Sequence, residues 1–226
     1  MVGRTPSEIS LIGVSKTRTA EEVVAAVTAG LHDFGENRVQ EAMEKKRRVQ
    51  SLLARNTLDT GKIRWHLIGR LQSNKVSKAV EIFDVIHSID SGDLARMVGR
   101  ASARMGKMID CYAQVNVSGE GSKSGVTIAE AEALAVEIAA QTSLRFVGFM
   151  TIGPLTKDQA VIESCFSELR SLRDQLGASH PEWGSPGLSM GMSDDYELAI
   201  ACGSTAVRIG TALFGARNYS PPAGIV

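Results

Sequence analysis

A lysine follows the first apolar run of the chain. The stretch LIGVSKTRTAEE (11–22) passes from a strand-like segment to Lys16, and then to a polar turn and the start of a helix. A lysine at the end of a strand is ordinary where it points into water. In a partly desolvated site, however, its pKa falls from the usual ~10.4, and the neutral amine can then attack a carbonyl carbon. Lys16 is therefore a candidate for forming a Schiff base.

A second group of candidate residues lies near the other end of the sequence. The stretch SMGMSDD (189–195) leads into a helix start, and RIGTALFG (208–215) belongs to the last apolar run. Ser189, Gly210 and Thr211 offer hydroxyl and backbone N–H groups, which bind phosphate well at helix N-termini. Together with Lys16 they predict a ligand that carries both a phosphate and a carbonyl group.

Eight short apolar and β-branched runs alternate with helical patterns, and they must position these residues. The strand candidates are ISLIGVSK (9–16), HDFGEN (32–37), RWHLIG (64–69), VIHSID (85–90), CYAQVNVS (111–118), FVGFMTIG (146–153), GLSMGMS (187–193) and AVRIGTALFG (206–215). Strands that alternate with helices form right-handed parallel units.

The helical segments between these runs have recognisable ends. Thr19 with Glu22, and Thr127 with Glu130, are spaced as capping boxes. Gly30 is placed to end the first helix. Ser193 is expected to cap the helix that begins at DDYELAIACG (194–203), since acidic residues favour a helix N-terminus.

Eight such units in 226 residues predict a single-domain (β/α)8 TIM barrel over residues 1–226. A doubly wound open sheet is the alternative, but it requires a G-x-G-x-x-G turn after its first strand, and that turn is absent. In a TIM barrel the chemistry lies at the C-terminal strand ends. Lys16, Asn37 and Thr211 all belong to this end, so we expect them to share one mouth.

Composition excludes several classes of function. The 25 basic and 25 acidic residues cancel, so no net field favours nucleic acid or an anionic membrane. Cys111, Cys165 and Cys202 are far apart and the four histidines show no ligand spacing, which argues against disulfides and a metal. No signal segment or run of ~18 apolar residues is present. We therefore expect a cytoplasmic protein.

Several long motifs resemble one known family. They are VSKT, DFGEN-x-x-Q, WH-x-IG-x-LQSNK, IHSID, N-x-SGE-x-SKSG, GFMTIGP, LSMGMSDD and VRIGTALFGAR. In order and spacing they are similar to those of the pyridoxal 5′-phosphate homeostasis proteins, which are related to the barrel domain of alanine racemase. The resemblance runs from about Gly13 to Tyr219. Arg70 is a departure, because histidine is expected there.

The resemblance implies a cofactor and roles for six residues. Lys16 would carry pyridoxal 5′-phosphate as an internal aldimine, and Asn37 would lie near its ring. Ser189, Gly210 and Thr211 would hold the phosphate. Arg208 would approach the pyridine nitrogen, and because arginine keeps its proton, the nitrogen would stay unprotonated and the ring would be a weak electron sink.

The resemblance therefore implies a vitamin B6 homeostasis protein that holds pyridoxal phosphate without strong catalytic turnover. Its partners would be the cofactor itself and pyridoxal-phosphate-dependent apo-enzymes, with no nucleic acid and no membrane, and we expect a monomer. The alternative is an amino-acid racemase. That reaction needs acid–base groups on both faces of the substrate, and we expect no second domain after the last strand to supply the second group. A phosphosugar enzyme without a cofactor is a third alternative.

Overall fold

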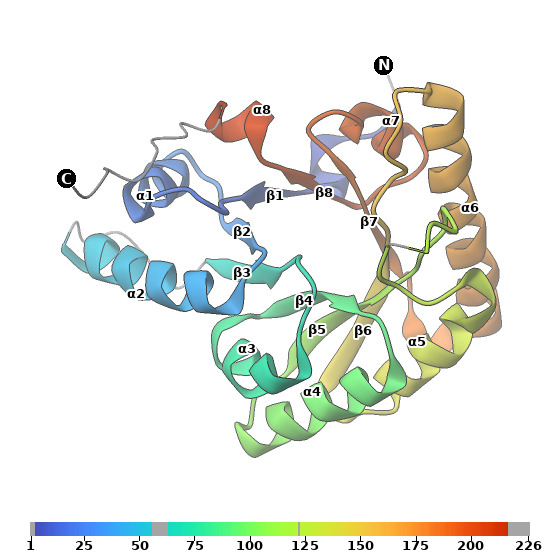
Figure 1. Ribbon diagram of the computed structural model, residues 1–226, viewed down its shortest axis with the longest axis horizontal. Coiled ribbons are helices and arrows are strands. Elements are labelled where there is room, and N and C mark those ends of the chain that lie inside the picture. Colours follow the sequence, from blue (N-terminus) through green and yellow to red (C-terminus); the bar gives the residue numbers. More distant parts are fainter. Residues whose placement is uncertain (1–2, 56–62, 122, 217–226) are drawn as a thin grey trace, which may run out of the picture.

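The computed structural model describes residues 3–55, 63–121 and 123–216. Within these ranges eight parallel strands pair in chain order, and β8 pairs with β1 to close a barrel (Figure 1). The strands are β1 (Ser10–Val14), β2 (Asp33–Glu36), β3 (Arg64–Leu67), β4 (Val85–Ile89), β5 (Ile109–Gln114), β6 (Leu144–Met150), β7 (Gly187–Met192) and β8 (Ala206–Ile209). The predicted TIM barrel is confirmed, and the open sheet is excluded.

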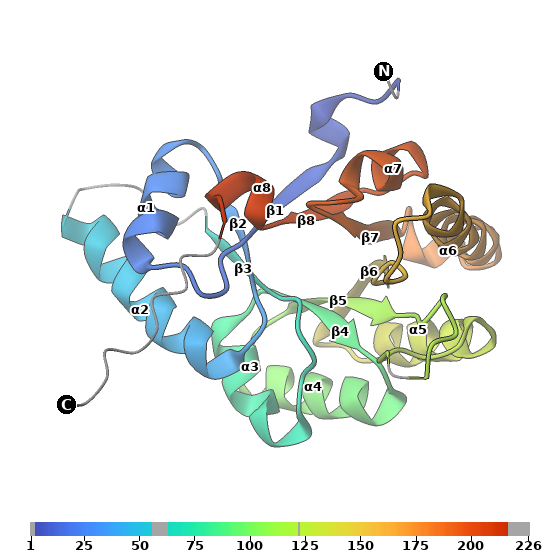
Figure 2. The same cartoon turned by 45° about the horizontal axis from the view of Figure 1, so that its top comes forward.

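Helices surround the barrel (Figures 1 and 2). Helices α1 to α7 each connect one strand to the next, and α8 follows the last strand. They are α1 (Ala20–Thr28), α2 (Val39–Arg55), α3 (Val76–Ile82), α4 (Gly92–Arg104), α5 (Ala131–Ala139), α6 (Gln159–Ser179), α7 (Tyr196–Ala201) and α8 (Thr211–Phe214). Short 3₁₀ turns are η1 (Pro6–Glu8), η2 (Ser73–Lys75), η3 (Ile128–Glu130) and η4 (Pro181–Trp183). In both views α8 lies beside the end of β1.

The predicted local signals set the helix ends. Glu22 and Thr19 form the capping box that begins α1. The Glu130 carboxylate accepts the backbone N–H of Thr127 where η3 leads into α5. Gly30 follows the end of α1 with φ +96°, a left-handed conformation that favours glycine.

Several predicted boundaries differ from the structure. β5 and β6 each begin two residues earlier than predicted, because Asp110 on β5 accepts two hydrogen bonds from Arg145 on β6, so the paired charges extend both strands. The end of the last strand candidate is helical, since Thr211–Phe214 forms α8. The predicted strand there ends at Ile209.

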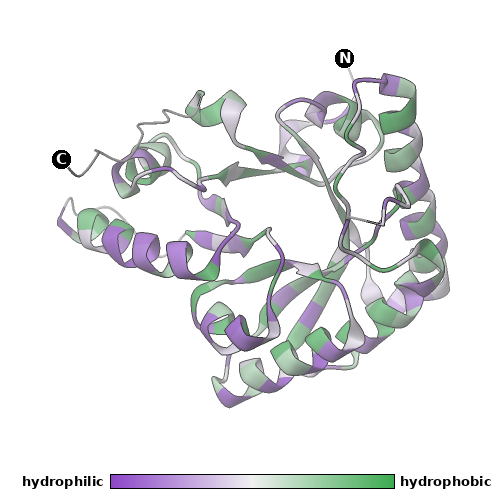
Figure 3. Ribbon diagram, viewed as in Figure 1, coloured by the Kyte–Doolittle hydropathy of each residue, from purple (hydrophilic) through white to green (hydrophobic). Residues whose placement is uncertain are grey.

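The space between the barrel and its helices is apolar. Phe34, Trp65, Phe83 and Phe166 are almost completely buried there, and the outward face of α2 is hydrophilic (Figure 3). The barrel interior is different, because His87 and other polar groups are buried inside it. A barrel core is usually filled by branched apolar side chains, so this polarity indicates a function.

Among the described residues, no helix is long and apolar enough to cross a membrane. Cys111, Cys165 and Cys202 are buried free thiols. Tyr219, where the family resemblance ends, lies outside the described residues.

Candidate functional site

Lys16 lies in a turn two residues beyond the end of β1, half-buried at the C-terminal mouth of the barrel. The next residue, Thr17, has φ +65°. A β-branched residue rarely adopts this left-handed conformation, and strain of this kind concentrates at functional sites. The turn is therefore held by its surroundings rather than by local preference.

A buried ion cluster holds the backbone on both sides of Lys16. From α2, Lys45 donates to the carbonyl oxygen of Ser15 and to Glu36 Oε1 at 2.6 Å. The Ser15 hydroxyl donates to the same oxygen at 2.7 Å, while the backbone N–H of Thr17 donates to Glu41 Oε1 at 2.7 Å. Hydrogen bonds thus fix the residue before Lys16 and the residue after it.

The carboxylate of Glu36 is the least solvated member of this cluster. Its side chain is completely buried, and Oε2 has no hydrogen-bond partner. Burial raises the pKa of Glu36 above its ordinary value, although the charge and hydrogen bond of Lys45 oppose the rise. No role for Lys45 was predicted from the sequence, because lysines in a basic helical segment such as 44–48 are usually solvated.

Strand pairing brings the predicted residues to neighbouring loops. Lys16 follows β1, Asn37 follows β2, and Gly210 with Thr211 follows β8. Because β1 pairs in parallel with both β2 and β8, these three strand ends are adjacent. The structure therefore brings Lys16, Asn37, Gly210 and Thr211 to one side of the mouth.

Asn37 is positioned by a close backbone contact with the end of β3. A Cβ atom added to Gly69 would lie 2.3 Å from the carbonyl oxygen of Asn37. Only glycine fits this approach, which gives the glycine of the WHLIG segment a physical reason.

Ser193 completes a set of polar groups at the start of α8. Its hydroxyl oxygen accepts from the backbone N–H groups of Gly210 at 3.2 Å and Ala212 at 3.4 Å. Thr211 lies between them with an exposed side chain. The hydroxyls of Ser193 and Thr211 and the two backbone N–H groups are donors of the kind that bind phosphate oxygens.

The expected cap role of Ser193 is therefore wrong. Helix α7 begins at Tyr196 with Asp195 as its N-cap residue, and the carboxylate of Asp195 accepts the backbone N–H of Met192. The local pattern suggested a cap, but the long-range contact with α8 decides where the Ser193 side chain lies.

Ser189, predicted at the phosphate site, lies elsewhere. It pairs in register with Ala206, four residues before Gly210, which is about 13 Å along the strand at ~3.3 Å per residue. Its hydroxyl accepts from Arg208 at 2.7 Å and bonds to His87 at 2.8 Å. Ser189 is thus inside the barrel, and Ser193 takes its predicted place beside Gly210 and Thr211.

Arg208 is buried directly below the mouth. One of its terminal nitrogens donates to Ser189, and the other donates to the carbonyl oxygen of Thr151 at 2.9 Å. Burial lowers the pKa of Arg208 to about 10, which still leaves the guanidinium charged at neutral pH. A ligand above it would meet a permanent donor.

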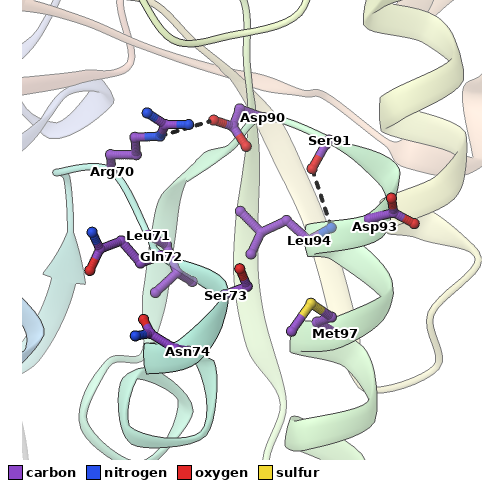
Figure 4. A pocket seen from close by; sticks show the side chains of 10 residues that line it. All are labelled: Arg70, Leu71, Gln72, Ser73, Asn74, Asp90, Ser91, Asp93, Leu94 and Met97. Carbon is purple, nitrogen blue, oxygen red and sulfur yellow. Dashed lines mark hydrogen bonds and ion pairs between the residues drawn. The ribbon is translucent and has the colours of Figure 1, made fainter.

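A cavity of about 500 Å³ lies at the same end of the barrel, between the segments that follow β3 and β4. Figure 4 shows Arg70 pointing toward Asp90 across it, with 3.9 Å between the charged groups. Burial raises the pKa of Asp90, although Arg70 opposes the rise. Arg70 is mostly exposed, so the residue that departs from the family pattern keeps a polar role at the rim.

Two histidines form a contact that was not predicted from the sequence. His66 and His87 lack any ligand spacing, yet their ring nitrogens are 2.9 Å apart inside the barrel. Each is the third residue of its predicted strand run, so both point inward, and this shared position was the available signal. In the part of the chain that the structure describes, no group of three or more metal-ligating side chains is found.

Comparison with known proteins gives consistent matches. Residues 3–218 match the family model described as "Alanine racemase, N-terminal domain". The pyridoxal phosphate homeostasis protein of Pseudomonas aeruginosa is 42% identical over 221 residues, which is 98% of this chain and 90% of that protein. The protein of the same name from Escherichia coli K12 is also 42% identical and covers 96% of this chain and 90% of its own length.

Solved structures agree with these matches. PipY of Synechococcus elongatus with PLP bound is 38% identical, with a TM-score of 0.83, over 94% of this chain and 95% of that chain. PipY without PLP gives a TM-score of 0.86 at 37% identity over the same shares. An alanine racemase of Clostridium difficile, at 12% identity and a TM-score of 0.71, shares the fold, and the match spans 96% of this chain and 54% of that chain.

Proposed function

Because the chain belongs to the family of the alanine racemase N-terminal domain and, within it, to the pyridoxal phosphate homeostasis proteins, we propose that it binds pyridoxal 5′-phosphate at the C-terminal mouth of its barrel. Its function is then to hold the cofactor and supply it to apo-enzymes, without strong turnover of a substrate. The PipY structure with PLP bound supports the choice of cofactor.

The donor chemistry of the mouth fits this group. The backbone N–H groups of Gly210 and Ala212, with the hydroxyls of Ser193 and Thr211, would bind the phosphate. This cradle is the observation that carries the proposal. It follows β8, which pairs with β1, and Lys16 follows β1. The bound cofactor supplies an aldehyde, and the amine of Lys16 would form the Schiff base with it.

Arg208 supports storage rather than catalysis. Its guanidinium keeps its proton at neutral pH, so toward a ring nitrogen it acts only as a donor. A ring nitrogen that receives this bond carries no proton, and it withdraws electrons less than a protonated one. Asn37, held by Gly69, would lie beside the ring and limit its movement.

The phosphate cradle is tested by comparing ligands and matched variants. The wild-type protein should bind pyridoxal phosphate far more tightly than pyridoxal, since the charge-assisted hydrogen bonds require the phosphate. Ser193→Ala and Thr211→Val should each weaken binding by roughly 1–3 kcal/mol for pyridoxal phosphate only. Ser73→Ala, an exposed serine beside the neighbouring cavity, is the control. Equal affinities for the two ligands would contradict the cradle.

The carrier function is tested by two further measurements on protein saturated with pyridoxal phosphate. Cofactor should transfer to an apo-enzyme, and hydrogen exchange at the α-carbon of alanine in deuterated water should proceed no faster than with free cofactor. Exchange near ~1 per second lies in the ordinary enzyme range and would favour a racemase instead.

A further inference from the structure

A chain of hydrogen bonds runs through the barrel interior, from Asp33 at the start of β2 to Arg208 near the end of β8. Asp33 Oδ1 lies 2.8 Å from His66 Nε2, and His66 Nδ1 lies 2.9 Å from His87 Nε2. His87 Nδ1 then lies 2.8 Å from Ser189 Oγ, which accepts from Arg208 at 2.7 Å. We name Asp33, His66, His87 and Ser189 the interior relay.

The two ends of the chain determine its direction. Burial opposes ionisation of Asp33, but the hydrogen bond from His66 and the nearby charges hold its pKa below the ordinary value, so it is a carboxylate that only accepts. Arg208 at the other end only donates. A neutral His66 must therefore carry its proton on Nε2, facing Asp33, and accept at Nδ1.

The same reasoning fixes the next two links. His87 must donate from Nε2 to His66, so its Nδ1 is bare and accepts the hydroxyl hydrogen of Ser189. That leaves a lone pair of Ser189 Oγ for Arg208. Burial lowers the pKa of His87 well below its ordinary value, as do the charges of His66 and Arg208, so His87 stays neutral.

The middle of the relay is buried, and its Asp33 end is partly exposed to solvent. His87 and Ser189 are completely buried, and the ring of Tyr112 stacks on His87 at 4.4 Å. His66 lines a small cavity of about 160 Å³ at the N-terminal end of the barrel, and Asp33 is about one quarter exposed. The titratable and charged side chains that face the two histidines are Asp33, Arg64, Asp110, Tyr112 and Arg208.

We propose that the interior relay positions Arg208 at the C-terminal mouth, because the direction that Asp33 sets leaves a lone pair of Ser189 Oγ to accept from the guanidinium. The proposal rests on the proposed function, in which Arg208 faces the ring nitrogen of the cofactor. The residues of the relay are positioning residues, since they act through Arg208.

The first test uses cofactor-free protein, so it does not depend on cofactor binding. ¹⁵N NMR of labelled histidine distinguishes protonated from bare ring nitrogens. In wild-type protein we expect Nε2 of both rings to be protonated and Nδ1 of His87 to be bare. A His87 that carries its hydrogen on Nδ1 would overturn the assigned direction.

Asp33→Asn tests the direction of the relay. An amide can donate as well as accept, so both directions become possible and a mixture of His87 tautomers is expected at neutral pH. A single unchanged tautomer in this variant would overturn the assignment of Asp33 as the group that sets the direction.

The second test measures the effect at the cofactor. Ser189→Ala should raise the Kd for pyridoxal phosphate about 3–10-fold and shift the visible band of the bound cofactor, because Arg208 loses the contact that fixes it. Ser204→Ala, which removes another buried hydroxyl from outside the relay, should change the Kd less than twofold and leave the band in place. An unaltered Kd and band in Ser189→Ala would overturn the link to Arg208. Absence of cofactor binding in wild-type protein would contradict the proposed function instead.

Discussion

The two mouths of the barrel use charge in different ways. At the N-terminal mouth, Asp110 accepts hydrogen bonds from Arg64 and from Nε and Nη2 of Arg145, at 2.7–2.8 Å. These charges satisfy one another. At the C-terminal mouth, Lys16 and the phosphate cradle come from separate loops and converge on one region. The pairs at the N-terminal mouth hold strands together, and the polar groups that neighbouring loops bring to the C-terminal mouth are suited to a ligand.

The ion cluster of Lys45, Glu36 and Glu41 is the exception at the C-terminal mouth. It is buried and closed like the pairs at the opposite mouth, yet it lies directly beneath the turn of Lys16. We therefore expect it to affect stability and ligand binding together. Variants in each mouth can separate effects on stability from effects on ligand binding.

Removal of Lys45 should have the largest effect. Lys45→Met leaves the buried carboxylate of Glu36 without its cation, which typically costs about 3–5 kcal/mol of unfolding free energy. Urea denaturation measures this change, and the affinity for pyridoxal phosphate should fall as well. The double variant with Glu36→Gln should recover part of the stability, while Arg48→Met, on the exposed face of α2, should change it by less than about 0.5 kcal/mol. Equal losses in the single and double variants would contradict the cluster's role.

The ion pairs of Asp110 at the N-terminal mouth should affect stability alone. Asp110→Asn removes charge-assisted hydrogen bonds to Arg64 and Arg145 and should lower the unfolding free energy by about 2–3 kcal/mol. The Kd for pyridoxal phosphate should stay within twofold of wild type. Asp93→Asn, whose side chain is largely exposed, is the control. A large fall in affinity for Asp110→Asn would break the division between the mouths.

Substitution of Thr17 should change stability and cofactor affinity in opposite directions. Its left-handed conformation costs about 1–2 kcal/mol for a residue with a Cβ atom, and glycine avoids this strain at an entropic cost of roughly 0.5–1 kcal/mol. Thr17→Gly should therefore stabilise the fold by up to about 1 kcal/mol while weakening cofactor binding several-fold, because the turn of Lys16 is less fixed. Denaturation and ligand titration of the same preparation decide this, and a gain in both properties would contradict the account.

The acid dependence of stability should differ between the mouths. The pKa of Asp33 is lowered in the folded state, so its contribution is present above the ordinary value of 3.8 and is lost as the pH falls through the folded pKa. The pKa of Glu36 is raised, so its contribution is present below 4.5 and is lost as the pH rises through its folded pKa.

Urea denaturation between pH 3 and 7 measures both slopes. The stability difference between wild type and Asp33→Asn should shrink as the pH falls, whereas the difference between wild type and Glu36→Gln should shift against wild type as the pH rises. Differences that stay constant with pH would show that neither carboxyl group is linked to folding in this way.

The sequence predicted the architecture well because the relevant signals are local. Alternating strand runs, the capping box of Thr19 and the glycine after α1 each depend on neighbouring residues. The starts of β5 and β6 were missed because Asp110 looks unfavourable in a strand until Arg145 is opposite it. Pairing across strands is not visible in either run alone.

The site was predicted less completely for the same reason. Lys16, Asn37, Gly210 and Thr211 were expected at one mouth because they stand toward the C-terminal ends of predicted strand runs, and the structure brings these positions together. Their roles toward a cofactor stay predictions. Ser193 was assigned to the wrong neighbour, since its partners are some twenty residues away in the sequence. The contact between His66 and His87 depends on two adjacent strands facing inward at one level, which only the closed barrel determines.

Reductive trapping identifies the lysine that carries the cofactor. The protein is saturated with pyridoxal phosphate, reduced with borohydride and digested, and the modified peptide is identified by mass spectrometry. A single stoichiometric adduct on Lys16 is expected, with loss of the visible band and of the adduct in Lys16→Ala. An adduct that survives in Lys16→Ala and maps to Lys75 or Lys123 would contradict the account.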